Sequence, residues 1–278
     1  RQMCIRDRLN LFNMKNLLFM LAALVTFATS AQSIVEVTYL DMPATKIGRF
    51  VELHKEMLET MNGDQRTSKG HWVYRHWYGS GAAIAIYEVY DSAEDCVNDN
   101  PLAAFQQNVA KLPEEERAKM AEKFQEWWSH YDGHWDEMRV LDMENFHVTK
   151  ENVDWDKPFV FVAGQYNAEN IAEAANAYMD WQIRPGVAEG PIMGGGVSSH
   201  FKGAGLDIEV YQSYESLVEF AKHVESGSAG NAEARRTFWG NIQGQHSDQI
   251  YLHIGHMENG VFTVSYTHLR AHETLLDR

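Results

Sequence analysis

The sequence predicts an α+β fold made of two similar halves joined in one chain. Residues 88–97 (EVYDSAEDCV) recur as residues 209–218 (EVYQSYESLV), in each case where a strand is expected to run into a helix. The predicted elements also follow the same order, β-α-β-β-α-β, in both halves. An apolar content of 45% is sufficient for a sizeable core in a chain of 278 residues.

The first half opens with residues 35–42 (VEVTYLDM), whose β-branched and aromatic side chains predict a strand. A helix follows, opened by Pro43 and Thr45 and stopped by Asn62-Gly63. Its apolar face contains His54, which we expect to be a core histidine rather than a ligand. The residues of this face recur at helical spacing: Ile47, Phe50, Val51, His54, Met57, Leu58 and Met61.

A hairpin is predicted next, because residues 71–78 and 82–90 are rich in β-forming side chains and flank the turn Gly79-Ser80-Gly81. Ser92 with Asp95 has the spacing of a helix N-cap. The remaining predicted elements are a helix from Pro113, with its acidic first turn and a buried stripe that includes Trp127 and Trp128, and a strand over residues 138–143.

The second half repeats this order after a polar linker at residues 149–157. Ser213 is expected to start the helix after its hairpin. The predicted elements are a strand at 159–166, a helix at 168–183 ended by Pro185-Gly186, a hairpin of 194–202 and 206–211 around Gly203-Ala204-Gly205, and a strand at 250–256.

Both ends of the chain look separate from this fold. Residues 14–31 have a basic start, a short apolar stretch and a small-residue cleavage site, which predicts a secretory signal peptide and a periplasmic or extracellular location. Residues 1–13 and 264–278 are interpreted as non-native segments, because they resemble translated sequencing-adapter read-through. The two repeats then span residues 32–150 and 151–263.

The net charge of −15 makes nucleic acid and anionic membrane poor partners. No membrane insertion is expected after signal cleavage, and self-association stays open. Only Cys96 lies between the two end segments, so no intrachain disulfide is predicted there.

The β-α-β-β-α-β unit is the ferredoxin-like split motif, whose sheet has helices on one face only. Two such units can cover each other's open faces. The sequence therefore resembles the dimeric α+β barrel superfamily, in a fused tandem form, over about residues 34–258. The resemblance implies a small-molecule cleft beneath the sheets. Its members include cofactor-free or haem-using monooxygenases, peroxidases, chlorite-decomposing proteins and lyases.

Strand alternation predicts which side chains enter that cleft. The apolar sets ending in Val89 and Val210 are expected to lie under the helices. The opposite faces then point inward, together with Ser198, Leu141, Tyr251 and His253. We take His76, Glu88, His200 and Glu209 as candidate catalytic residues, and Tyr74, Tyr90, Asp207, Tyr211 and Arg139 as candidate ligand-binding residues.

Alternative interpretations stay open for these residues. The inward glutamates fit a polar pocket, a solvated barrel mouth or hydrogen bonds between the two sheets. The pairs His134-x-Asp136 and His246-x-Asp248 fit an oriented base or metal ligand, but a loop-to-strand cap is favoured because the pair occurs twice. A haem would need an axial histidine such as His76, His200 or His253.

No CxxC, HExxH, P-loop, GxGxxG or GxSxG motif is present, and no metal site is predicted. The cofactor is left open. Two functions are carried forward. One is an exported small-molecule-binding protein, a monooxygenase-like enzyme with a polar pocket between the sheets. The alternative is a non-catalytic periplasmic or surface interaction module.

Overall fold

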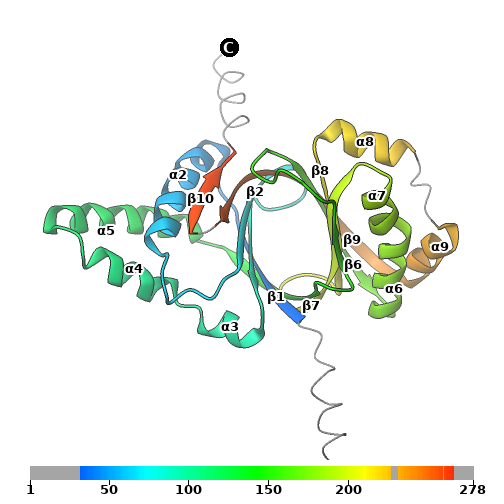
Figure 1. The fold of residues 1–278 in the computed structure, drawn as a ribbon, viewed down its shortest axis with the longest axis horizontal. Helices are drawn as coiled ribbons and strands as arrows, with labels where there is room; N and C mark the ends of the chain where they lie inside the picture. Colours follow the sequence, from blue (N-terminus) through cyan, green and yellow to red (C-terminus); the bar gives the residue numbers. More distant parts are fainter. Residues whose placement is uncertain (1–31, 227–230, 259, 266–278) are drawn as a thin grey trace, which may run out of the picture.

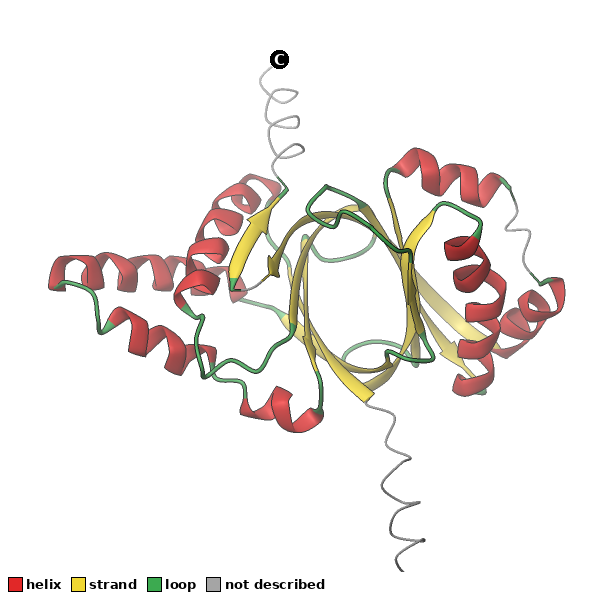
Figure 2. Ribbon diagram, in the orientation of Figure 1, coloured by secondary structure: helices red, strands yellow, loops and turns green. Residues whose placement is uncertain are grey.

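The computed structural model describes residues 32–226, 231–258 and 260–265. The core of the fold is a closed barrel of eight antiparallel strands with helices packed outside it (Figures 1 and 2). The strands follow the order β9-β2-β3-β1-β4-β7-β8-β6, and β6 pairs with β9 to close the barrel. The expected α+β class is therefore confirmed, with the two sheets joined edge to edge rather than merely stacked.

The first half supplies four neighbouring barrel strands in the order β2-β3-β1-β4. Its helices α2, α4 and α5 lie on the outer side of these strands (Figure 1). The bounds are β1 (Gln32–Leu40), α2 (Ala44–Thr60), β2 (Gly70–Gly79), β3 (Ile84–Tyr90), α3 (Ala93–Asn98), α4 (Pro101–Val109), α5 (Glu114–Trp128), η1 (Ser129–Tyr131) and β4 (Trp135–Asp142).

The second half supplies the other four barrel strands in the order β7-β8-β6-β9. When the strands are counted along each half, both halves have the order second, third, first, fourth. The bounds are β5 (His147–Thr149), β6 (Val160–Ala168), α6 (Ile171–Tyr178), η2 (Met179–Ile183), α7 (Arg184–Ala188), β7 (Ile192–Gly203), β8 (Ile208–Tyr214), α8 (Leu217–Glu225), α9 (Ala232–Asn241), β9 (Ile242–Glu258) and β10 (Val261–Val264).

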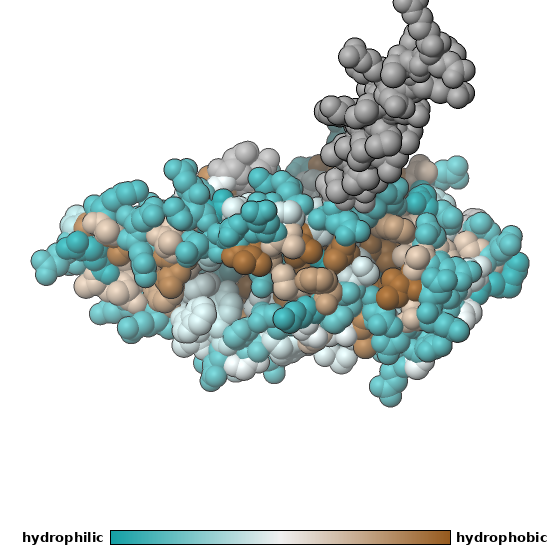
Figure 3. All heavy atoms as spheres, turned by 90° about the horizontal axis from the view of Figure 1, so that it is seen from below, coloured by the Kyte–Doolittle hydropathy of each residue, from teal (hydrophilic) through white to brown (hydrophobic). Residues whose placement is uncertain are grey.

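Three apolar cores hold this arrangement together. One lies between α2 and the first-half strands and includes Phe50, Met57 and Ile86. A second lies between the second-half strands and their helices. The third lies inside the barrel. On the face shown in Figure 3, hydrophilic residues cover both ends of the molecule, and most visible apolar residues lie nearer the middle.

Several local expectations are confirmed, and others are corrected. Ser92 caps α3 by accepting a hydrogen bond from the Asp95 backbone N–H, and His54 is a buried core residue. Pro185 does not end a helix: it lies in the first turn of α7, directly after the π-helical turn η2. The predicted single helix is instead α6, a π-helical turn (η2) and α7. Trp128 is 56% exposed rather than buried.

The structure changes the register of the internal sequence match. Ser216, and not Ser213, caps the helix after β8, as Ser92 caps the helix after β3. The spatial counterpart of each residue in β3 therefore lies three residues further along than the sequence match indicated. Three is an odd number, so this shift exchanges the two faces of the strand. Glu88 corresponds in space to Gln212 and not to Glu209.

The signal-peptide prediction and most of both predicted non-native segments lie outside the described residues. Val264 pairs with Gly255 in the β10–β9 ladder, and the Ser265 hydroxyl donates to the Asp156 carbonyl. Among the described residues, we find no helix with the length and apolarity needed to cross a bilayer.

Candidate functional site

The barrel interior contains a cavity of about 270 Å³ with mostly apolar walls, which we call the aromatic chamber. Alternate residues of β2, β3, β6 and β8 point into it because successive side chains of a strand face opposite sides. Tyr74 and Phe161 stack at 4.5 Å between ring centroids in one wall. The aromatic rings that line the chamber are Trp72, Tyr74, Tyr87, Trp155, Phe159, Phe161 and Tyr211.

A second cavity of about 140 Å³ lies next to the chamber, and we call it the polar mouth. Its lining includes Ser80, Glu137, Gln165, Ser247, Gln249 and Tyr251. Tyr87 and Glu209 line both cavities. The Glu209 carboxylate therefore lies at the boundary between an apolar space and a polar one.

Glu209 is 2% exposed and is held by neutral hydrogen-bond donors. The Gln165 amide nitrogen donates to Glu209 Oε2 at 3.1 Å, and the Tyr87 hydroxyl lies 3.4 Å from the same oxygen. The same Gln165 nitrogen donates to Glu137 Oε1 at 2.8 Å. Gln165 thus bridges two buried carboxylates with its two N–H groups.

Arg139 supplies the positive charge of this cluster. Its side chain is fully buried, and Nη1 forms an ion pair with Glu137 Oε2 at 2.9 Å. Nε donates to the Ser198 hydroxyl at 2.8 Å, and Nη2 donates to the Leu206 carbonyl at 3.2 Å. The Tyr39 hydroxyl donates to Glu137 Oε1 at 2.7 Å. Glu137 and Arg139 therefore form a buried ion pair, whereas no cation within the described part of the chain is bonded to Glu209.

Electrostatics distinguish Glu209 from an ordinary carboxylate. Burial raises its pKa, Arg139 opposes the rise, and Glu137 adds to it, so that the pKa of Glu209 is about 6. A carboxyl with this pKa exchanges its proton near neutral pH. This is the property of a general base or acid.

A segment between the halves closes one side of the aromatic chamber. Its short strand β5 pairs with Gly194, Gly195 and Gly196 of β7, and Trp155 follows it. The His147 ring lies 2.9 Å from the Tyr211 hydroxyl through Nδ1, and burial lowers the pKa of His147. Because these glycines lack side chains, the segment around β5 can approach β7 closely. The Gly-Gly-Gly run is therefore explained by packing and not by nucleotide binding.

Gly196→Ala is expected to destabilise the protein by about 1–3 kcal/mol, because overpacking forces backbone shifts. An added Cβ would lie 2.3 Å from the Phe146 carbonyl oxygen and 2.7 Å from the Tyr211 hydroxyl. Thermal denaturation measures the change. Gly240→Ala is the control: it lies in α9 with open space around it, and should be neutral or stabilising by up to about 1 kcal/mol. Equal effects of the two substitutions would contradict the packing explanation.

The structure brings some of the sequence-predicted residues together. Tyr74, Tyr211 and Glu209 line the aromatic chamber, and Arg139 belongs to the buried cluster beside it. The expected inward positions of Ser198, Leu141 and Tyr251 are also correct.

The predicted inward orientation of Glu88 and Tyr90 is wrong. Glu88 lies behind the sheet, where Arg66 Nη2 approaches its Oε1 at 2.8 Å and His71 Nδ1 approaches it at 3.0 Å. The Tyr90 hydroxyl donates to Asp99 Oδ2 at 3.3 Å on the same side. Val89, expected under the helices, lines the aromatic chamber instead.

Three further candidates line neither cavity. The His76 ring lies edge-on against Tyr251, and its Nε2 is buried with no hydrogen-bond partner within the described part of the chain. His200 Nε2 lies 3.3 Å from the Gly203 carbonyl oxygen, and Asp207 accepts from the Ala168 backbone N–H at 3.0 Å. These residues lie near the strand ends and are not assembled with Glu209.

Sequence reasoning missed four residues of the site. Glu137 was detectable, because it precedes Arg139 by two positions and shares its face of β4. Gln165 lies opposite Glu209 in the β6–β8 register, which no local pattern reveals. Trp155 lies in the segment predicted to be a polar linker (residues 149–157), and His147 lies two residues before it; only the folded structure brings them to the chamber.

Other polar groups have structural partners. His134 and Asp136 lie 3.3 Å apart, His246 and Asp248 lie 2.8 Å apart, and all four are exposed. Thr38 donates across the ladder to Asp136, which supports a strand-fastening role. No group of residues suited to holding a metal ion is found among the described residues.

The histidines proposed as haem ligands do not line the aromatic chamber. His253 is stacked on Phe159 at 4.4 Å, and burial, assisted by His256, lowers its pKa to about 3. None of the three predicted axial ligands, His76, His200 and His253, is therefore among the described residues that line the aromatic chamber.

Comparisons with known proteins agree with this fold. An anthrone oxidase-like protein matches with a TM-score of 0.53 and 12% identity, over 83% of this chain and 94% of that chain. A proposed monooxygenase from Fusobacterium nucleatum gives a TM-score of 0.52 and 11% identity, over 83% and 96%. Another from Lactobacillus acidophilus gives 0.50 and 8%, over 84% and 97%.

These neighbours have dimeric α+β barrel folds, and this chain shares that fold. No protein-family model and no curated protein matches the sequence.

Proposed function

We propose that the protein binds a small molecule inside the barrel and acts as a monooxygenase-like enzyme. The observation that carries the proposal is Glu209, a buried carboxylate with a pKa of about 6 at the wall of an aromatic chamber. The monooxygenase names of two proteins with the same fold support it. We further propose that the halves are ferredoxin-like repeats, which their common strand order supports.

The chamber favours a flat, neutral, weakly acidic substrate. Its walls are aromatic rings, which favour stacking with a planar ligand. The cluster at its boundary has two carboxylates and one guanidinium, so an anionic ligand would meet a net negative charge. A phenol or a carbon acid, by contrast, can donate its proton to Glu209.

The proposed chemistry begins with proton transfer from a substrate CH₂ group to Glu209. The electron pair left on carbon reduces dioxygen, and a C–O bond forms. The resulting peroxide anion takes back the proton from Glu209 to form a hydroperoxide, which then loses water to leave a carbonyl group. The balance is one CH₂ group and one O₂ giving one C=O and one H₂O. Arg139 and Gln165 lower the pKa of Glu209 and so oppose the effect of burial. The pKa stays at about 6, where the carboxyl group can both accept and return a proton.

Export is a further part of the proposal. It rests on the signal-peptide pattern of residues 14–31 and places the mature protein in the periplasm or outside the cell. The test is N-terminal sequencing of the protein recovered from the periplasm or the medium of growing cells, where the chain is expected to start at residue 32. A protein that stays in the cytoplasm and starts before residue 32 would contradict export.

Ligand binding is tested with 2-naphthol and its anionic analogue 2-naphthoate, followed by fluorescence of the purified protein. We expect naphthol to bind at least about tenfold more tightly than naphthoate, because the carboxylate of the analogue meets Glu209. Lack of naphthol binding, or equal affinities, would contradict the proposed chamber and favour a non-catalytic interaction module.

Catalysis is tested with anthrone, a neutral aromatic carbon acid, under air. Oxygen uptake and anthraquinone formation are expected in equal amounts. Glu209→Gln should lower the rate by about 10²–10⁴-fold, the usual contribution of a general base. Glu88→Gln is the matched control, since Glu88 lies behind the sheet. A similar loss in both variants would show that the effect is structural.

A further inference from the structure

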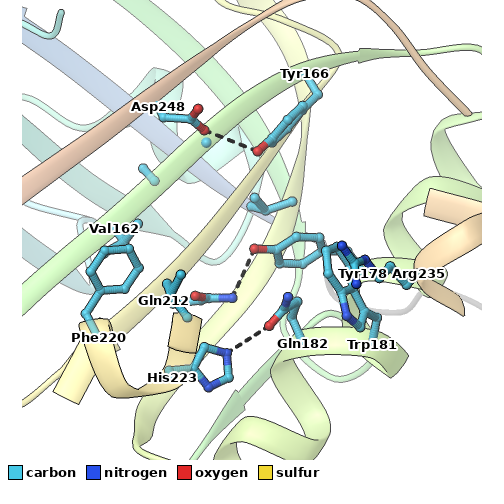
Figure 4. Close-up of a pocket in the computed structure, with 14 residues that line it drawn as sticks. Val162, Tyr166, Tyr178, Trp181, Gln182, Gln212, Phe220, His223, Arg235 and Asp248 are labelled. Carbon is cyan, nitrogen blue, oxygen red and sulfur yellow. Dashed lines mark hydrogen bonds between the residues drawn. The ribbon is translucent and has the colours of Figure 1, made fainter. Parts of the chain in front are cut away.

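A third cavity lies outside the barrel, between the second-half strands and their helices, and nothing in the proposed function uses it. Its volume is about 270 Å³. Figure 4 shows its lining, which comes from β6, α6, the π-helical turn η2, β8, α8, α9 and β9. We call it the outer cavity. The side chains that the argument uses are Tyr178, Gln182, Gln212, Phe220 and His223.

Two hydrogen bonds link neutral polar groups along this cavity (Figure 4). Gln212 Nε2 donates to the Tyr178 hydroxyl at 3.0 Å, and His223 Nε2 lies 2.8 Å from Gln182 Oε1. Gln212 and His223 are 5% and 8% exposed. Burial lowers the pKa of His223, which favours the neutral ring. Buried polar groups are costly unless they are satisfied.

The corresponding place in the first half is filled by an arginine of the chain itself. Arg66 Nη2 contacts Glu88 Oε1 at 2.8 Å, and Arg66 Nε lies 3.0 Å from Asp99 Oδ1. In space, Gln212 takes the place of Glu88. His223 takes the place of Asp99, since each lies seven residues after the serine that caps its helix.

The second half has a glycine at the chain position equivalent to that arginine, although Arg235 of α9 lines the outer cavity and lies over the Trp181 ring. His71 pairs with Glu88, and Gly195 pairs with Gln212 in the equivalent ladder. Arg66 precedes His71 by five residues, and the fifth residue before Gly195 is Gly190. The two partners that hold Arg66 in the first half are thus replaced by an amide and an imidazole, with an open cavity beside them.

We propose that the outer cavity is a binding site for a small neutral polyhydroxyl molecule of monosaccharide size. Amide, phenol and neutral imidazole groups both donate and accept hydrogen bonds, as hydroxyl groups do, so a sugar can insert into both bonded pairs. Phe220 and Tyr178 offer apolar surfaces for its C–H faces. The π-helical turn that carries Gln182 is a second indication, since such turns are frequent at functional sites.

The test uses the full protein and three probes, D-glucose, D-galactose and myo-inositol, observed by saturation-transfer NMR and by titration calorimetry. At least one probe should bind, and Gln212→Leu and His223→Phe should each weaken it by about tenfold or more. Gln182→Leu, at a half-buried position, provides a third variant if a buried substitution prevents folding. Lys222→Ala is the matched control, because it neighbours His223 on α8 and its side chain is 63% exposed.

Glu209→Gln separates this site from the barrel. It should leave sugar binding unchanged, whereas the three outer-cavity variants should leave naphthol binding unchanged. Failure of all three probes to bind would overturn the proposal. So would sugar binding that persists in the Gln212, Gln182 and His223 variants, or a preference for L-arginine, which would indicate a cation site like that of the first half.

Discussion

Replacing Arg139 with methionine is expected to lower the free energy of unfolding by about 3–5 kcal/mol at pH 7. The guanidinium is fully buried and is the cation paired with Glu137, whose side chain is also fully buried. Its loss leaves the buried carboxylates of Glu137 and Glu209 without that compensating charge. Urea denaturation at pH 7 measures the loss. Its size should shrink as the pH falls, because the carboxyl groups can then take up protons.

The double variant Glu137→Gln/Arg139→Met is the control for this prediction. It removes both charges of the pair but keeps an amide oxygen that can accept from Tyr39 and Gln165. Much of the lost stability should return, because removing both partners of a buried ion pair costs far less than removing one. A single variant as stable as the wild type would mean that the charge cluster is solvated.

Glu209→Gln is expected to stabilise the protein at pH 7–8 while it removes activity. The pKa of Glu209 is raised to about 6 in the folded protein, against 4.5 as the ordinary value. The folded state therefore binds more protons than the unfolded state between these pH values. Stability falls as the pH rises through this window and stays lower above it, by about 2 kcal/mol for this group. The glutamine variant lacks this loss.

The measurement is a series of urea denaturation curves from pH 4.5 to pH 8. The stability of the wild type relative to the variant should fall as the pH rises through the window between 4.5 and about 6. Burial and the neighbouring Glu88 raise the pKa of Glu36 to about 7, so Glu36 contributes a similar slope in both proteins. Burial lowers the pKa values of His54, His147, His223 and His253, so these histidines contribute a slope of the opposite sign, equally in both proteins. Glu116→Gln, on the exposed surface of α5, should leave the curve unchanged. Parallel curves for wild type and Glu209→Gln would contradict the raised pKa.

The sequence predicts much of the fold because each prediction depends on local chemistry. Helical spacing from Ile47 to Leu58 identifies α2, and the glycines after Tyr78 identify the first hairpin. The Ser92 cap follows from its own side chain. These features are set within a few residues, and the folded structure keeps them.

The candidate site is less predictable because it depends on which face of each strand meets the barrel. β3 has apolar residues on both faces, since Ile84 and Ile86 lie under the helices while Ala85 and Tyr87 face inward. Alternation alone cannot tell which of two apolar faces meets the barrel interior. The internal sequence match was three residues out of register, so it assigned Glu88 to the wrong face. Glu209 was placed correctly because β8 has polar residues on one face only at that end.

A crystal structure of the protein with 2-naphthol tests the central claim most directly. We predict that the rings lie in the aromatic chamber among Trp72, Phe159 and Phe161, with the hydroxyl oxygen within hydrogen-bond distance of a Glu209 carboxylate oxygen. A chamber without ligand at saturating naphthol, or naphthol bound only outside the barrel, would contradict the account.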